Sequence, residues 1–393
     1  MKDEYDVVVV GAGPGGSIAA KTAAEHDLDV LLIEKRAEIG NPVRCAEGVG
    51  KEGIKSFIKP DRSWISAEVK GARIYSPDGT AIEMSEDMAG PEVGYVLERK
   101  IFDRALALQA ARAGAEVMVK TRATGLIMED GFVKGVKGKH FGDDFTVRAS
   151  VIIGADGVES KVGRWAGIDT TLKLSDIETC AQFLMTDIDF NPDYCDFYVG
   201  NEIAPGGYAW IFPKGGHEAN VGLGILGSRA GEIKAMDLLK RFVKEKFPDG
   251  QVLEIIVGGV PVSGPLERTI ANGLMLVGDA ARMADPITGG GIVNAMLTGQ
   301  IAGEVAAKAL SRGDTSTKAL SEYENRWKSA IGAPLKNSLR AKEIFTKMSD
   351  EKLNALAHSI KDVDFSEMTA TGLLRALVKR NPKILWELRH LLK

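Results

Sequence analysis

The fold is decided near the start of the chain by the stretch Asp6-Val-Val-Val-Val10-Gly11-Ala-Gly13-Pro-Gly15-Gly16. The β-branched run before the glycines predicts a buried parallel strand, and the residues after them, to about His26, predict a helix. A second strand, Asp29–Ile33, ends in Glu34. This strand–helix–strand unit carries Gly-x-Gly-x-x-Gly at its first turn, which predicts a dinucleotide-binding site.

Each glycine of this turn has its own task in such a site. Gly11 permits the tight turn, Gly13 lets the backbone approach a pyrophosphate, and Gly16 lets the helix pack on the strand. The amide groups and the positive dipole end of the helix then bind phosphates. A carboxylate at Glu34 suits the two hydroxyls of an adenosine ribose. A glycine-rich turn without a ligand is the alternative.

A second match to the same pattern, Gly222-x-Gly224-x-x-Gly227, has a different context. It lies inside an alternating strand and does not follow one. We therefore interpret it as a glycine-rich strand end that lies close to a neighbour or a ligand. The sequence predicts one dinucleotide site.

The third feature is Gly278-Asp279, which follows the buried strand Gly273–Val277 and precedes Gly289–Gly291 at the start of a predicted helix. An aspartate at a strand end can accept a hydrogen bond from a ribityl hydroxyl. Helix amides can face the N1–C2=O edge of a flavin, which carries negative charge when reduced. FAD is therefore the expected dinucleotide, although Asp279 as a simple helix cap is the alternative.

Composition limits the classes of protein that fit. Of 393 residues, 50 are Lys or Arg and 54 are Asp or Glu, and the net charge of −4 argues against binding nucleic acid through bulk charge. The three cysteines and five histidines show no disulfide or metal-ligand spacing, so we expect no metal site and a reducing compartment. Neither a signal peptide nor an apolar run of about 20 residues is evident, which predicts a cytoplasmic protein.

We expect an α/β (α+β) fold with three regions. The Rossmann-like FAD-binding domain is discontinuous and takes residues 1–60, 98–175 and 264–310. Within it we expect a small meander at about 123–148 and a separate buried strand at Val151–Gly154. A β-rich substrate domain takes residues 61–97 and 176–263, and Ser76–Gly79 predicts a hairpin within it. The residues from 311 to 393 form a C-terminal helical region.

Several of these stretches, together with Gly154-Ala-Asp156-Gly157 and Gly289–Ile292, resemble the p-hydroxybenzoate-hydroxylase-type flavoproteins. Two more resemble the geranylgeranyl reductases within that group, specifically the archaeal digeranylgeranylglycerophospholipid reductases. Pro205–Pro213 fits their P-x-x-Y-x-W-x-F-P pattern, and Val43–Gly48 is similar to their loop beside the flavin, with Ala46 where glycine is frequent. The resemblance implies that reduced FAD saturates the C=C bonds of geranylgeranyl chains in precursors of archaeal ether phospholipids.

The resemblance also implies which residues form the site. The expected cofactor-binding residues are Gly11, Gly13, Pro14, Gly15, Gly16, Glu34, Lys35, Arg44, Cys45, Ala46, Gly48, Arg99, Ala123, Asp156, Gly278, Asp279, Gly290, Gly291 and Ile292. Arg99 as a surface charge and Asp156 as a turn former are the alternatives for two of them. The expected substrate-binding residues are Tyr208, Trp210, Phe212 and Pro213, and the expected catalytic residues are Cys45, Glu47, Tyr208 and Trp210.

Two of these roles have a chemical reason. Tyr208, Trp210 and Phe212 alternate along a strand and so share one face, where they make a flat apolar wall suited to a polyprenyl chain; a sheet core is the alternative. An alkene that accepts a hydride also needs a proton. Cys45, Glu47 or a water held near Tyr208 are the candidate donors, whereas a small buried thiol and a solvated carboxylate are the alternatives.

The remaining expectations concern partners. The tail Leu373–Lys393 carries six Lys or Arg against one acid, with apolar residues on one helical face. It could rest peripherally on an anionic membrane or pack on its own domain. With one dinucleotide site, the electrons come from an external donor: ferredoxin, a deazaflavin or transiently bound NAD(P)H. The alternative functions are an FAD-dependent aromatic hydroxylase or halogenase on the same scaffold, and a non-catalytic flavin- and lipid-binding protein.

Overall fold

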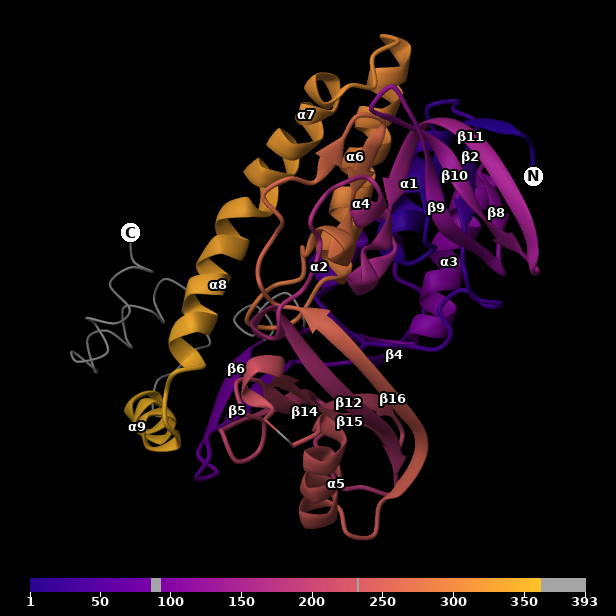
Figure 1. Ribbon diagram of the computed structural model, residues 1–393. Coiled ribbons are helices and arrows are strands. Elements are labelled where there is room, and N and C mark those ends of the chain that lie inside the picture. Colours follow the sequence, from indigo (N-terminus) through magenta and orange to yellow (C-terminus); the bar gives the residue numbers. More distant parts are fainter. Residues whose placement is uncertain (86–92, 232, 362–393) are drawn as a thin grey trace.

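The structure, a computed structural model, describes residues 1–85, 93–231 and 233–361. Figure 1 shows a layered body at the top, a second sheet below it, and helix α8 (Ala333–Phe345) running beside both. Within the described residues, the strands form sheets of eight, seven and three strands. The expected α/β (α+β) fold, with a Rossmann-like part and a separate β-sheet part, is confirmed.

The larger sheet has the parallel centre of a dinucleotide-binding unit. Strand β1 (Glu4–Val10) pairs in parallel with β2 (Val30–Ile33) on one side and with β11 (Asp143–Gly154) on the other. Its other strands are β8 (Glu116–Met118), β17 (Ile270–Ala271), β18 (Leu274–Leu276), and the antiparallel ribbon of β9 (Thr121–Glu129) and β10 (Phe132–His140). This order places the end of β1 centrally, where the glycine turn follows.

One expected boundary is wrong. The buried strand at 151–154 is not separate from the preceding meander, because β11 runs through both without a break. Its first half pairs antiparallel with β10 and is partly exposed, whereas its last four residues are buried and all pair in parallel with β1. A change of pairing partner along one extended strand needs no turn, so the change of hydrophobic pattern does not mark a boundary.

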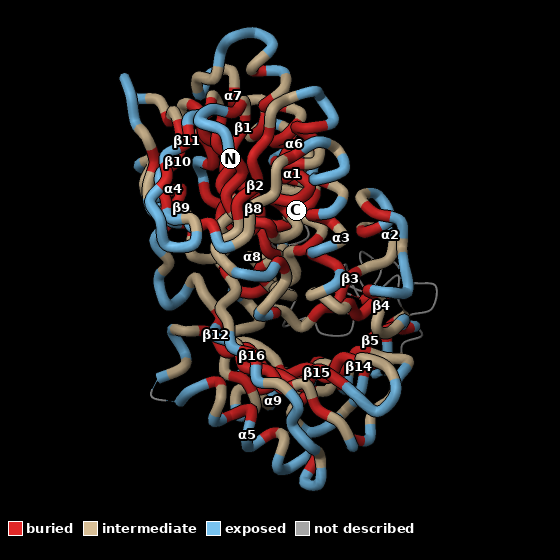
Figure 2. Tube along the Cα trace, turned by 90° about the vertical axis from the view of Figure 1, so that its right-hand side faces the viewer, coloured by how far each residue is buried: buried red, intermediate tan, exposed pale blue. Residues whose placement is uncertain are grey.

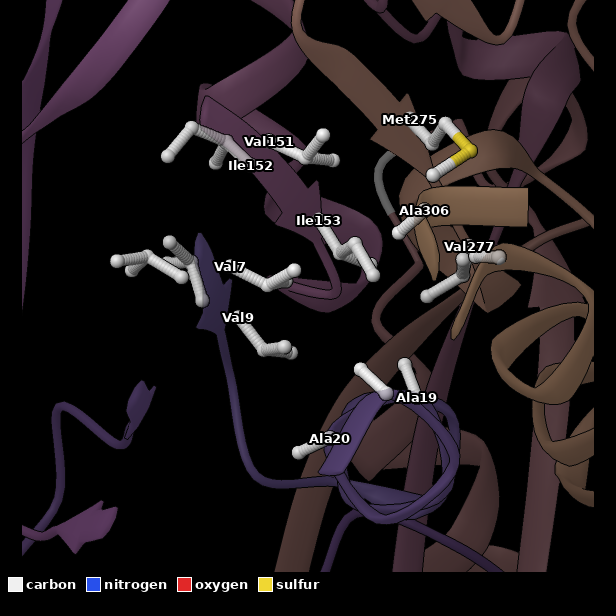
Figure 3. Close-up of a cluster of buried hydrophobic side chains, with 14 of the residues drawn as sticks. Val7, Val9, Ala19, Ala20, Val151, Ile152, Ile153, Met275, Val277 and Ala306 are labelled. Atoms are coloured by element: carbon white, nitrogen blue, oxygen red, sulfur yellow. The ribbon is translucent and has the colours of Figure 1, made fainter. Parts of the chain in front are cut away.

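Two helices bring their N-terminal ends together beside this sheet. α1 (Pro14–Ala24) starts after Gly13, and α6 (Ile292–Ser311) packs alongside it, with α3 (Arg99–Arg112) also touching α1. The approach is close because glycines meet: a Cβ on Gly299 would lie 2.2 Å from the Gly15 carbonyl oxygen. Figure 3 shows part of the core beside these helices, in which Ala19 and Ala20 of α1 and Ala306 of α6 belong to one cluster with Val7 and Val9 of β1.

The lower sheet carries the aromatic strand. From edge to edge it consists of β16 (Gln251–Pro261), β12 (Ile177–Thr186), β15 (Glu218–Leu226), β14 (Tyr208–Gly215), β13 (Tyr194–Val199), β5 (Gly71–Tyr75) and β6 (Ala81–Ser85). Helix α5 (Ala235–Lys246) packs on β12 and β15. Figure 2 shows the buried segments of this sheet as a band below the larger core. The expected hairpin at Ser76–Gly79 is confirmed, since it joins β5 to β6.

A small sheet links the two bodies. It pairs β3 (Gly48–Val49) with β7 (Tyr95–Leu97), and β7 with β4 (Ile65–Glu68). It therefore joins residues that we expected in the FAD-binding domain to residues that we expected in the substrate domain. The exact division into domains stays a prediction.

The C-terminal part descends from the upper body to the lower sheet. α7 (Thr317–Trp327) is followed by a π-helical turn, then by α8, and α9 (Asp350–Ile360) reaches β6. The short helices α2 (Lys51–Lys55) and α4 (Lys161–Trp165) complete the structure. The basic tail at 373–393 lies outside the described residues. No helix in the described ranges has the length and apolar character that crossing a membrane requires.

Candidate active site

Three cavities share walls and form one path through the protein. The first, here called the nucleotide groove, has a volume of about 640 Å³ and begins at Glu34. The second, the central cavity, of about 310 Å³, shares Gly13, Arg99 and Asp279 with the groove. The third, the apolar cavity, of about 380 Å³, shares Glu178, Phe197, Tyr208 and Thr288 with the central cavity. The path thus runs from the glycine turn to the space under α8 and α9.

The nucleotide groove is formed by the features that the sequence predicted. Gly11 has a φ of +107°, and a Cβ there would lie 2.4 Å from the Ala155 carbonyl oxygen, so only glycine fits. Gly13 has no neighbour within 4 Å of a virtual Cβ, which leaves its backbone open to a ligand. The Glu34 carboxylate accepts hydrogen bonds from the amides of Ala12 (3.1 Å) and Arg36 (2.9 Å) at the end of β2. The other expected residues on this groove are Lys35, Arg44, Arg99, Ala123, Asp156 and Asp279.

Two half-buried carboxylates on this path have hydrogen-bonding capacity left over. Asp156 accepts from the Val162 amide through Oδ2 (3.0 Å), but its buried Oδ1 has no hydrogen bond. No described residue donates to the carboxylate of Asp279. Burial raises the pKa of both groups. Because a buried acceptor without a donor is costly, hydroxyl groups of a dinucleotide sugar or ribityl chain would satisfy both, and the residues present fit FAD.

The residues at the start of α6 form one wall of the central cavity. Gly290, Gly291 and Ile292 line the cavity together with Gly278 and with Pro14, Gly15 and Gly16 of α1. Asp285 Oδ1 accepts from the amides of Ile287 (2.9 Å) and Thr288 (3.0 Å) and thereby orders the loop before the helix. Two helix N-termini point at one cavity, which favours negative charge there. The arrangement therefore suits the pyrophosphate and a reduced flavin.

The loop Val43–Gly48 is anchored by the carboxylate of Glu47. Glu47 is 3% exposed; its Oε1 accepts from the Arg99 amide (2.8 Å), and its Oε2 accepts from Lys214 Nζ (2.6 Å) and Asn220 Nδ2 (2.8 Å). The alternative of a solvated carboxylate is thus wrong. These donors stabilise the ionised carboxylate and hold the loop on β14 and β15. Whether Glu47 relays a proton stays a prediction.

Cys45 lies in the same loop and lines the central cavity, as do Arg44, Ala46 and Gly48. The Glu47 amide donates to its Sγ (3.1 Å), and Gln182 Nε2 donates to its carbonyl oxygen (3.2 Å). Burial raises the pKa of the Cys45 thiol, so it stays protonated at neutral pH. The thiol is placed at the cavity, but its catalytic role stays a prediction.

The aromatic strand faces the central cavity as its alternation predicted. Tyr208, Trp210 and Phe212 all line the cavity, and Phe197 of β13 packs edge-on against Tyr208 and Phe212. Trp210 Nε1 donates to Gln182 Oε1 (2.9 Å) across the position of Gly222, where a Cβ would lie 2.5 Å from the indole ring. This fits our interpretation of the second glycine motif as a close approach to a neighbour. Pro213 alternates to the other face and lines none of the three cavities, so the geometry does not support its expected substrate contact.

Sequence reasoning missed the residues that the neighbouring strand supplies. Glu178, Cys180 and Gln182 of β12 all line the central cavity. They pair with Leu226, Gly224 and Gly222 of β15. These three residues recur with a period of two along β12, but that period shows only that their side chains share one face. Which cavity that face borders depends on the neighbouring strands.

The apolar cavity extends the path away from the flavin side. It is lined mainly by apolar side chains of β5, β6, α8 and α9, among them Ile74, Met84, Phe345, Leu353, Leu356 and Ile360. Among the residues that the structure describes, Glu178 and Lys342 are the charged side chains on its wall. A long hydrocarbon chain fits such a lining because each buried CH₂ contributes about 0.8 kcal/mol. One end of such a chain would reach Tyr208 and the central cavity.

Comparison with known proteins agrees with this geometry. A family described as "FAD binding domain" matches residues 4–204, and one described as "Geranylgeranyl reductase catalytic domain" matches residues 176–260. A digeranylgeranylglycerophospholipid reductase 2 of Methanococcoides burtonii is 62% identical, and the alignment covers 100% of this chain and 97% of that protein. A digeranylgeranylglycerophospholipid reductase of Methanosarcina mazei is also 62% identical, with the same coverages.

Solved structures show the same fold. A geranylgeranyl bacteriochlorophyll reductase-like protein from Thermoplasma acidophilum superposes with a TM-score of 0.93 at 44% identity, covering 99% of both chains. A flavin-dependent brominase superposes with a TM-score of 0.71 at 17% identity, covering 95% of this chain and 93% of that one. The second likeness shows the fold alone.

Proposed function

Because the chain belongs to the family of digeranylgeranylglycerophospholipid reductases, we propose that it saturates the C=C bonds of geranylgeranyl chains on glycerophospholipid precursors of archaeal membranes. It is an FAD-dependent oxidoreductase. The observation that best supports the lipid substrate is the apolar cavity under α8 and α9, which opens at Tyr208 into the cavity that fits the flavin.

Different residues along the path would bind different parts of FAD. Gly11, Gly13 and the N-terminus of α1 would hold the pyrophosphate, and Glu34 the adenosine ribose. Asp279 would accept from the ribityl chain. Bound FAD, once reduced, supplies a hydride. The contribution of the protein is to position the alkene and to exclude water, since an alkene has no carbonyl that could be polarised.

We propose catalytic roles for the same four residues that we expected from the sequence: Cys45, Glu47, Tyr208 and Trp210. Tyr208 and Trp210 form a wall that holds a double bond flat against the flavin, with Phe212 extending the wall. Glu47 anchors the flavin-side loop through Lys214, and Cys45 contributes a neutral surface beside it.

Two partners belong to the proposal as well. The electrons come from an external donor, a ferredoxin, a deazaflavin or NAD(P)H, because the sequence offers one dinucleotide site. The basic amphipathic tail at 373–393 provides peripheral contact with an anionic membrane, from which the substrate lipid enters.

The test is anaerobic incubation of the FAD-loaded protein with dithionite and an unsaturated diether phospholipid, followed by mass spectrometry of the extracted lipid. We expect a gain of two hydrogens for each C=C bond reduced. The same mixture without dithionite is the control. An unchanged lipid would favour the non-catalytic binding protein. In a separate aerobic assay, consumption of oxygen together with NAD(P)H and an aromatic substrate would favour the hydroxylase.

A further inference from the structure

A buried glutamate stands where the central cavity meets the apolar cavity. Glu178, near the start of β12, lines both cavities and is 7% exposed. It lies opposite Leu226 of β15 and Val260 of β16, so its backbone is fixed on both sides by the sheet. Its position is therefore set by the two neighbouring strands of the lower sheet.

Two glycines clear the space around this carboxyl group. A Cβ on Gly224 would lie 2.9 Å from Glu178 Oε2, and a Cβ on Gly207 would lie 3.4 Å from the same oxygen. No described residue donates a hydrogen bond to the carboxyl group. A buried carboxyl group without a donor is neutral more readily than ionised, because burial disfavours the charged form. Its hydrogen-bonding capacity is left for something inside the cavities.

The charged and titratable groups around Glu178 leave it without a close ion pair. Lys342 of α8 faces it across the apolar cavity, but its Nζ donates to the carbonyl oxygens of Val262 (2.7 Å) and Ser175 (3.5 Å). Cys180 lies on its own strand and Tyr208 on β14. The other ionisable groups on the central cavity are Arg44, Cys45, Glu47, Arg99 and Asp279. Burial raises the pKa of Glu178 to about 7, and the charge of Lys342 opposes that rise.

We propose that Glu178 is the catalytic acid that protonates the alkene during reduction, an assignment that rests on the function proposed above. Glu178 lines the wall where the apolar cavity adjoins the central cavity. In this proposal, the acid protonates a double bond that lies between the apolar cavity and Tyr208.

In the proposed reduction, each alkene carbon receives one hydrogen. The less substituted alkene carbon takes the carboxyl proton, and the more substituted carbon, where positive charge is better tolerated, takes the hydride that reduced FAD supplies. The π bond, the O–H bond of the carboxyl group and the N–H bond of reduced FAD that holds the hydride break, and two C–H bonds form. The alkene is reduced, FAD is oxidised, and the carboxylate regains its proton from water that enters when the product leaves.

The other candidate donors are less suited to this step. Both oxygens of Glu47 already accept hydrogen bonds, from the Arg99 amide, Lys214 and Asn220, and these bonds engage its carboxylate in holding the loop. The raised pKa of Cys45 keeps its proton in place but makes the thiol a weaker acid than Glu178. A general acid works best when its pKa lies near the working pH.

The test compares Glu178→Gln with the wild-type holoenzyme in the dithionite assay. An amide keeps the size and neutrality of the side chain but cannot donate a proton as an acid. We expect turnover to fall by about 100-fold or more with the KM for lipid and the FAD absorbance unchanged. Glu254→Gln is the matched control, because Glu254 lies in the same sheet, is half-exposed, and pairs with Lys100 (3.0 Å) away from the cavities.

A pH profile adds a readout that a structural role would not move. Wild-type turnover should fall as the pH rises through about 7, and this limb should be absent from Glu178→Gln. Lys342→Met should shift the limb of the otherwise wild-type protein to higher pH, because removing a positive charge raises the pKa of a nearby carboxyl group. If Glu178→Gln keeps turnover within about three-fold of wild type and retains the limb, the assignment is overturned.

An infrared pH titration of the FAD-loaded wild-type protein does not depend on any variant. The carbonyl band of a protonated carboxyl group should persist to about pH 7. A carboxyl population that titrates entirely near the ordinary value of about 4.3 would overturn the assignment even if Glu178→Gln failed to fold. If the wild-type protein leaves the lipid unsaturated, the proposed function fails; if both wild type and Glu178→Gln saturate it, Glu178 alone fails.

Discussion

The close contact between Gly222 and Trp210 makes the aromatic wall testable by adding one methyl group. In Gly222→Ala, the new Cβ would lie 2.5 Å from Trp210 Cζ2 and 2.9 Å from the Ala181 carbonyl oxygen. The indole must retreat by about 0.9 Å to regain ordinary contact at 3.4 Å. That movement breaks or stretches its 2.9 Å hydrogen bond to Gln182 and pushes the ring toward the central cavity.

The expected magnitude follows from these two effects. Overpacking costs about 1–3 kcal/mol, and loss of a neutral hydrogen bond costs about 1 kcal/mol more, so we expect a loss of about 2–4 kcal/mol in the free energy of unfolding. A wall displaced by about 1 Å should lower lipid turnover by about 100-fold. Reduction of the bound FAD by dithionite should be unaffected, because that step needs no alkene.

The assays are urea unfolding of the FAD-loaded protein and lipid reduction under dithionite. Gly125→Ala is the matched control, because Gly125 also lies in a strand but the nearest atoms to a Cβ there belong to the Lys137 side chain, in ordinary contact at 3.6 Å. The control should keep its stability within about 0.5 kcal/mol and its full turnover. If Gly222→Ala had the same turnover and stability as the wild type, the claim that Trp210 forms the reactive wall would be refuted.

Other perturbations probe the remaining parts of the site. Lys214→Met should destabilise the protein by about 3–5 kcal/mol in urea unfolding, because it leaves the Glu47 carboxylate buried without its cation. Adding Glu47→Gln to the same chain should restore part of that stability. A double variant as unstable as Lys214→Met would contradict the pairing. Asp279→Ala should weaken FAD binding by roughly 10- to 150-fold in a fluorescence titration, because a hydrogen bond to a charged group contributes about 1.5–3 kcal/mol. An unchanged affinity for FAD would show that Asp279 does not bind the cofactor. Cys45→Ala should keep lipid turnover within about ten-fold of wild type if Glu178 is the acid, whereas a loss as large as that of Glu178→Gln would return the thiol to the list of donors.

The nucleotide half could be predicted almost completely from local sequence. Gly11, Gly13 and Glu34 lie within one strand–helix–strand unit, and their tasks depend on φ angles and on a helix terminus, which neighbouring residues determine. The alternation of Tyr208 and Trp210 likewise predicts a common face. The error at β11 has the opposite origin, since the pairing partner changes along an unbroken strand and leaves no mark that separates one strand from two.

By itself, the sequence determined that the chain has one dinucleotide turn, a buried parallel strand before it, and an aromatic strand with a shared face, because these features depend on residues a few positions apart. Only the tertiary structure decided that Glu178 and Lys342 face one cavity, that Gly222 makes room for Trp210, and that Lys214 neutralises Glu47. These groups come from distant segments, and the burial that governs their charge exists only once the sheets and α8 have packed.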